Sequence, residues 1–274
     1  MQHQGQELDR WNHSLRRLAS DVGAATISAS LVAPAVAIID RAIVEKSSLN
    51  QSLLRGLRNH ALNAVRSPRN FVFRLPFGLI WSLYAVTFMV ANGTDSICDE
   101  MKYSAKGMAT FVATTLVNVP MAVWKDIRFA QIYGTDQGNV KMQPPLQNRG
   151  VARAATAIFL LRDCVTIFGS FTLAPKLSEV IPDRVATHPH AKPIITQLTM
   201  PVLTQLVATP MHLLALDLYM RQQSVPLVDR IVQSQRYLPS TTVVRCIRIV
   251  PAFGFGCLAN VELRSWLQAR MNIK

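Results

Sequence analysis

The sequence predicts an all-α membrane protein with six transmembrane helices, which form three pseudo-symmetric helix-pair repeats. Half of the 274 residues are hydrophobic and only 16% are charged, a balance that is typical of membrane proteins. Long uncharged stretches recur along the chain, and prolines recur within them at a near-constant period. The composition, the stretches and the period together carry the prediction.

Four stretches of 18 to 24 residues lack Asp, Glu, Lys and Arg, and each is long enough to cross a bilayer, which takes ~20 residues. They are residues 22–39, 75–94, 107–124 and 193–216. Two weaker stretches, residues 154–175 and 249–261, complete the six. Residues 1–20 form a polar lead-in that lacks the apolar segment of a signal peptide.

The net charge of +13 is concentrated in three segments of the chain. Residues 41–74, 125–162 and 217–248 contain 18 Lys and Arg against five acids, so they account for the whole net charge. In a six-helix chain these segments fall on one side of the membrane, as the positive-inside rule requires. The distribution therefore favours a lipid bilayer as the partner and disfavours nucleic acid, the other partner that a basic chain suggests.

Three prolines mark an internal repeat. Pro34, Pro120 and Pro210 lie 86 and 90 residues apart, and a Leu-Val pair precedes each of them by two to four residues. A fixed period indicates one supersecondary unit that is used several times. We therefore divide the chain after the lead-in into a domain of residues 21–274 with repeats at about 21–100, 101–187 and 188–274.

Three arginines are in phase with these prolines. Arg74, Arg162 and Arg248 follow the prolines by 40, 42 and 38 residues, a coincidence that three chance prolines leave unexplained. Ionisable residues within a membrane are costly and usually face a cavity or a partner. The alternative is that Arg162 pairs with the adjacent Asp163, while Arg74 and Arg248 extend to the polar surface at helix ends.

In the order of its prolines, basic loops and arginines, with the segments VPMAVWKDIR, LLRD and IRIVP, the chain resembles the mitochondrial carrier superfamily as a divergent member. The resemblance implies six helices around a central cavity. It also implies transport of a small anionic or zwitterionic metabolite across a mitochondrial membrane, the inner one or, alternatively, the outer one.

The carrier motif, Pro-x-Asp/Glu-x-x-Lys/Arg, implies a structural role for Pro34, Pro120 and Pro210 in a gate that interhelical charge pairs close. Lys125 is the one residue here that matches a charged position of the motif.

The resemblance further implies a substrate site on the even-numbered helices. Arg162 and Asp163 correspond to a pair that reads a zwitterion, and Arg248 corresponds to a ligand for a carboxylate. Arg74 forms the third wall of this site.

No group of residues in the sequence indicates catalysis. The four cysteines contain no Cys-x-x-Cys spacing, and there is no Gly-rich phosphate loop, so we expect no enzyme, no metal site and no cofactor. The alternative to transport is a non-transporting protein of carrier fold that acts in mitochondrial membrane organisation, fusion or contacts with protein partners.

The charge distribution makes a prediction about topology. The basic segments around Arg58, Arg149 and Arg236 are expected on one side of the membrane, with both termini on the other, because basic loops are retained on one side. Accessibility labelling of single cysteines, introduced into a cysteine-free variant, checks this arrangement. Labelling from opposite sides at any two of the three positions contradicts it.

Overall fold

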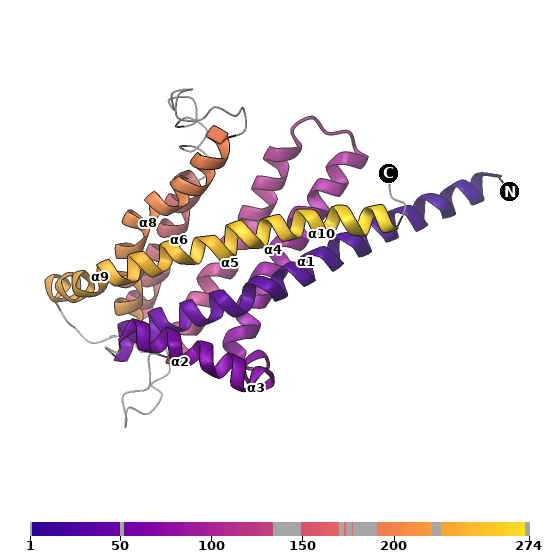
Figure 1. Ribbon diagram of the computed structural model, residues 1–274. Coiled ribbons are helices and arrows are strands. Elements are labelled where there is room, and N and C mark those ends of the chain that lie inside the picture. The colour runs from indigo at the N-terminus through magenta and orange to yellow at the C-terminus, as the bar shows by residue number, and fades with distance from the viewer. Residues whose placement is uncertain are drawn as a thin grey trace. The chain divides into compact units, whose positions relative to one another are not determined.

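A computed structural model describes residues 2–49, 52–133, 149–169, 191–220 and 226–271, together with the single positions 173 and 177. Within these ranges every element is a helix and no strand occurs, so the all-α prediction is confirmed (Figure 1). The helices are α1 (Gln2–Leu49), α2 (Leu53–Arg66), α3 (Pro68–Val72), α4 (Leu75–Glu100), α5 (Lys106–Tyr133), α6 (Arg149–Phe168), α8 (Ala191–Met220), α9 (Leu227–Ile249), the π-helix η2 (Val250–Phe255) and α10 (Gly256–Arg270).

Five helical stretches among the described residues are long and apolar enough to cross a membrane. They are Trp11–Lys46, Leu75–Glu100, Lys106–Ile132, Thr199–Tyr219 and Leu227–Arg270. The expected stretch at residues 249–261 lies inside the last of them. α6 is not among them, because its arginines and Asp163 interrupt its apolar composition. The chain is thus a multi-pass membrane protein, but the arrangement of six helices in three repeats is not confirmed.

The three repeat prolines lie inside long helices. Pro34 is in α1, Pro120 is in α5 and Pro210 is in α8, and each falls within a candidate membrane span. A proline in the interior of a soluble helix costs roughly 3 kcal/mol. Membrane helices accept it more readily, because neighbouring groups satisfy the freed carbonyl.

The chain forms two compact units, each assembled from separate segments. Unit 1 comprises Met1–Pro34, Val72–Ala122 and Ala252–Lys274, and unit 2 comprises Ala35–Phe71 and Val123–Pro251. Within unit 1, α10 runs beside the first part of α1 (Figure 1). Within unit 2, α8 packs against both α6 and α9.

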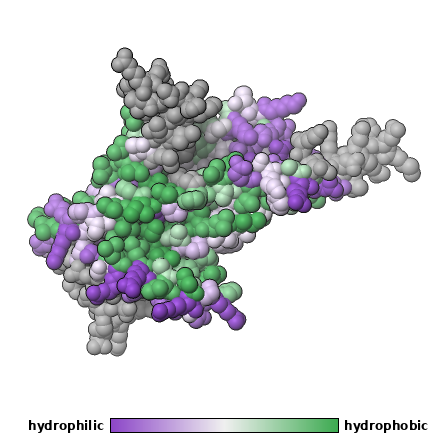
Figure 2. Space-filling model, in the orientation of Figure 1, coloured by the Kyte–Doolittle hydropathy of each residue, from purple (hydrophilic) through white to green (hydrophobic). Residues whose placement is uncertain are grey.

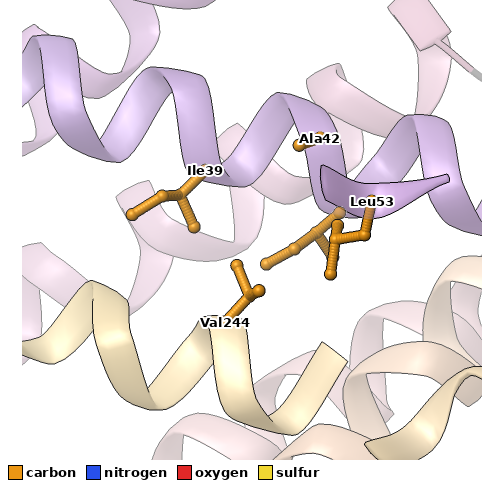
Figure 3. Close-up of a cluster of buried hydrophobic side chains, with 5 residues drawn as sticks. Ile39, Ala42, Leu53 and Val244 are labelled. Carbon is orange, nitrogen blue, oxygen red and sulfur yellow. The ribbon is translucent and has the colours of Figure 1, made fainter. Parts of the chain in front are cut away.

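A small hydrophobic core in unit 2 joins three helices. Ile39, Ala42 and Ile43 of α1 pack with Leu53 of α2 and Val244 of α9, and all five side chains are buried (Figure 3). The α1 residues recur at intervals of three and four, which places them on one face of the helix. This core holds the C-terminal part of α1 against α2 and α9.

Many large hydrophobic side chains remain exposed on the helices, which is costly in water and favourable in lipid. Figure 2 shows many hydrophobic residues, in green, on the surface of the helices. More than half of the residue's surface is exposed at Leu31 of α1, Leu116 of α5, Leu206 of α8 and Val250 of η2. The exposed apolar surface agrees with a membrane environment.

The core of unit 2 predicts a difference between two similar truncations. Ile43→Ala should lower the free energy of unfolding by about 2–5 kcal/mol, because Ile43 is buried and its loss leaves a cavity. Leu54→Ala, at an exposed position of α2, is the matched control and should cost less than about 1 kcal/mol. Thermal unfolding of both variants in detergent micelles measures the difference. Equal destabilisation contradicts the assignment of this core.

Candidate functional site

Each repeat proline is followed by a buried aspartate. Asp40 and Asp126 stand six residues after Pro34 and Pro120, and Asp217 stands seven residues after Pro210. All three carboxylates are buried in unit 2. A buried carboxylate needs a cationic partner or hydrogen bonds to offset the loss of its hydration.

Asp40 of α1 receives two cations from different helices. Lys125 Nζ of α5 lies 2.6 Å from Asp40 Oδ2, and Arg248 Nη1 of α9 lies 2.5 Å from Asp40 Oδ1. The same Lys125 Nζ lies 2.6 Å from Oδ1 of its neighbour Asp126. One lysine therefore bridges two carboxylates, and one carboxylate bridges two cations.

Arg162 of α6 is the centre of a second set of contacts. Its Nη1 forms an ion pair with Asp126 Oδ2, and its Nη2 lies 2.6 Å from Asp163 Oδ1. Arg162 Nη1 also donates to His212 Nδ1 of α8 over 2.8 Å. An arginine donates only, so His212 accepts through Nδ1 and carries its proton on Nε2. The guanidinium stacks over Phe159, 5.2 Å from the ring centroid.

These contacts form one continuous group within unit 2, which we term the ion-pair cluster. Its members are Asp40, Lys125, Asp126, Arg162, Asp163, His212 and Arg248. Three carboxylates balance three cations, and His212 is neutral. A buried ion pair adds little net stability compared with an apolar pair, whereas removal of one partner is strongly destabilising. The cluster thus places interdependent charges on α1, α5, α6 and α9, and the neutral His212 of α8 contacts them.

The structure brings together four of the residues that the sequence singled out. Lys125, Arg162, Asp163 and Arg248 all belong to the ion-pair cluster. Arg74 is the N-cap of α4 in unit 1, its side chain is exposed, and it makes no ion pair with the part of the chain that the structure describes. The substrate-binding role of these residues stays a prediction.

Sequence reasoning found Asp163 but missed Asp40 and Asp126, the other two acids of the cluster. The carrier motif places an acid two residues after the proline, where this chain has Val36 and Ala122. The acids that pair are Asp40 and Asp126, four residues further on. The signal was present in the sequence, since an aspartate follows each repeat proline by six or seven residues.

Further polar contacts join helices within each unit. In unit 2, Arg230 Nη1 of α9 lies 2.7 Å from Asp217 Oδ2 of α8. In unit 1, Arg264 Nε of α10 lies 2.6 Å from Oδ1 of the buried Asp21 of α1. Asn92 of α4 and Asn260 of α10 exchange hydrogen bonds of 3.0 and 2.8 Å beside that pair. Each unit therefore has its own buried polar contacts between helices.

The fold and the cluster define a class of protein. Long apolar helices that carry compensated charges at buried positions are typical of membrane transporters, in which intramembrane ionisable residues mark substrate or ion pathways. The chain belongs to the probable citrulline exporter family, which it matches over residues 24–268. Neither the curated proteins nor the solved structures contain a match to the chain.

The expected membership of the mitochondrial carrier superfamily is wrong, because the family that the chain matches is that of probable citrulline exporters. The physical difference lies in the charged residues. The acids of the carrier motif are absent, and aspartates at a different spacing from the prolines form the ion pairs. The expected mitochondrial location and the non-transporting alternative were both inferred from the resemblance to mitochondrial carriers. Neither is supported now that this resemblance is corrected. Membrane transport agrees with the family.

The interdependence of the cluster predicts a strong effect of one neutralised acid. Asp126→Asn should destabilise the protein by about 3–5 kcal/mol, because Arg162 and Lys125 lose a shared counter-ion. Asp229→Asn, at an exposed position of α9, is the control and should cost less than about 1 kcal/mol. Thermal unfolding in detergent measures both. If Asp126→Asn changes the stability as little as the control does, Asp126 is not an essential counter-ion of Arg162 and Lys125.

Proposed function

We propose that the protein exports citrulline, a small zwitterionic amino acid, across a membrane without covalent chemistry. Two independent lines support this function: the family that the chain matches and the buried charges on its helices. A zwitterion carries an ammonium and a carboxylate, so its binding site needs an acceptor for one end and a cation for the other. The ion-pair cluster contains groups of both kinds.

An unpartnered carboxylate oxygen of Asp163 supports a binding position for the substrate ammonium. Asp163 Oδ2 is buried and has no hydrogen-bond partner among the described residues, although Asp163 Oδ1 receives two bonds from Arg162. A buried carboxylate oxygen without a donor is costly, and such an atom in a native structure calls for an explanation. We assign Asp163 Oδ2 as the acceptor for the substrate ammonium and Arg162 as the residue that orients Asp163.

The other cations of the cluster have partners of their own. Arg248 was expected to bind the substrate carboxylate, and in the structure its guanidinium pairs with Asp40. A substrate carboxylate has to compete with Asp40 at this position. We therefore assign Arg248 and Lys125 chiefly to the ion pairs that hold α1, α5 and α9 together.

Transport itself is tested with purified protein in liposomes loaded with labelled citrulline. Efflux should exceed that of protein-free liposomes, and an excess of unlabelled citrulline on the outside should accelerate it by exchange or leave it unchanged. Efflux equal to that of protein-free liposomes contradicts the proposed function.

The assignment of Asp163 predicts selective loss of recognition for the amine. Asp163→Asn should reduce citrulline efflux by about tenfold, because a charged hydrogen bond is worth about 1.5–3 kcal/mol. Efflux of 5-ureidopentanoate, which lacks the α-amine, should change little in the same variant. An equal loss for both compounds indicates a structural role for Asp163 and contradicts the assignment.

A further inference from the structure

Arg245 of α9 is a buried cation outside the ion-pair cluster. Arg245 is only 5% exposed to solvent. Its Nε donates a hydrogen bond of 3.0 Å to Gln205 Oε1 of α8. It forms no ion pair with any described residue, in contrast to Arg162 and Arg248. Burial of a guanidinium is costly unless an anion compensates it. Arg245 is therefore a candidate to form an ion pair with an anionic group of a bound ligand.

Polar residues at helical spacing surround Arg245 on both helices. On α9, Thr241 precedes it by four residues, and on α8, Thr209 follows Gln205 by four residues. Residues four apart lie on the same face of a helix. The contacts of Gln205 with Arg245 and of Asp217 with Arg230 show that α8 and α9 run antiparallel. This register places Thr209 and Thr241 at the same level, one turn from the Gln205–Arg245 contact.

The two threonines carry a second, independent signal. Both residues are fully buried, with 0% exposure, and neither hydroxyl has a hydrogen-bond partner in the part of the chain that the structure describes. Threonines in a membrane helix usually satisfy their hydroxyl with the carbonyl four residues earlier, as Thr242 does with Leu238. Two unpartnered hydroxyls at one level indicate a place where a polar ligand supplies the missing bonds.

We propose that Gln205, Thr209, Thr241 and Arg245 form a carboxylate subsite, the α8–α9 polar strip, which binds the carboxylate of the transported amino acid. The inference rests on the proposed function and extends it to the anionic end of the substrate. The Arg245 guanidinium supplies charge and a planar pair of donors, which suits a carboxylate. The hydroxyls of Thr209 and Thr241 supply further donors.

The strip adjoins the ion-pair cluster along both helices. His212, seven residues after Gln205, contacts Arg162, and Arg248, seven residues after Thr241, contacts Asp40. Asp163 and Arg245, the proposed partners of the ammonium and the carboxylate, thus belong to the same unit. Arg248 is the weaker candidate for the carboxylate, because Asp40 already compensates it.

The test compares citrulline with citrulline amide, in which a neutral carboxamide replaces the carboxylate. The wild-type protein in liposomes should prefer citrulline by about tenfold, and Arg245→Gln should abolish this preference. Arg245→Lys should restore part of it, since lysine keeps the charge and loses the planar fork. Arg236→Gln, at an exposed position of α9, should retain the preference. An Arg245→Gln variant that retains the preference overturns the proposal.

The threonines give a test that does not depend on a buried charge. Thr209→Val and Thr241→Val keep the shape of the side chain and remove an unpartnered hydroxyl, so the melting temperature should be equal or higher. Their KM for citrulline should nevertheless rise severalfold, while Thr242→Val leaves KM unchanged. An unaltered KM in both threonine variants overturns the proposal.

Failure of the inference differs from failure of the function. A wild-type protein that moves no citrulline contradicts the proposed function. A wild-type protein that moves citrulline, together with an Arg245→Gln variant that keeps the preference over the amide, contradicts the carboxylate subsite alone.

Discussion

A charge inside a bundle of apolar helices has to be compensated there, and this constraint governs the centre of unit 2. Asp40 and Asp126 are buried on α1 and α5, and Lys125, Arg162 and Arg248 compensate them. Lys125 is on α5, Arg162 on α6 and Arg248 on α9, so the pairs connect several helices. Because an isolated charge in this environment costs several kcal/mol, the pairs select one arrangement of the helices against alternatives that separate them.

The same constraint links structure to transport. In the proposed function, a helix movement that separates these ion pairs carries a cost, and a charged substrate offsets it only if it interacts differently with the two states. Among the described residues, Asp163 Oδ2 has no hydrogen-bond partner, and Arg245 donates to Gln205 but has no anion beside it. Asp163 and Arg245 carry opposite charges. In the proposed function, a zwitterion supplies an ammonium for Asp163 and a carboxylate for Arg245, whereas a simple anion or cation supplies only one of the two.

Some of this organisation was predictable from sequence. Helices and membrane spans follow from hydropathy and length, and the repeat prolines indeed lie inside α1, α5 and α8. The pairing of charges was not predictable, because Arg162 meets Asp126 across 36 residues and Arg248 meets Asp40 across 208 residues. Local spacing carries no information on such contacts. The carrier motif expects acids at the positions of Val36 and Ala122, four residues before the aspartates that form the ion pairs.

The compensation of buried charge is tested most directly by a double-mutant cycle between Asp126 and Arg162, measured by thermal unfolding of the purified protein. The cycle comprises Asp126→Asn, Arg162→Gln and the double variant. The account predicts that each single variant leaves an uncompensated charge, so that the double variant is more stable than the sum of the single effects, with a coupling of about 1–3 kcal/mol. Additive effects of the two substitutions would contradict it.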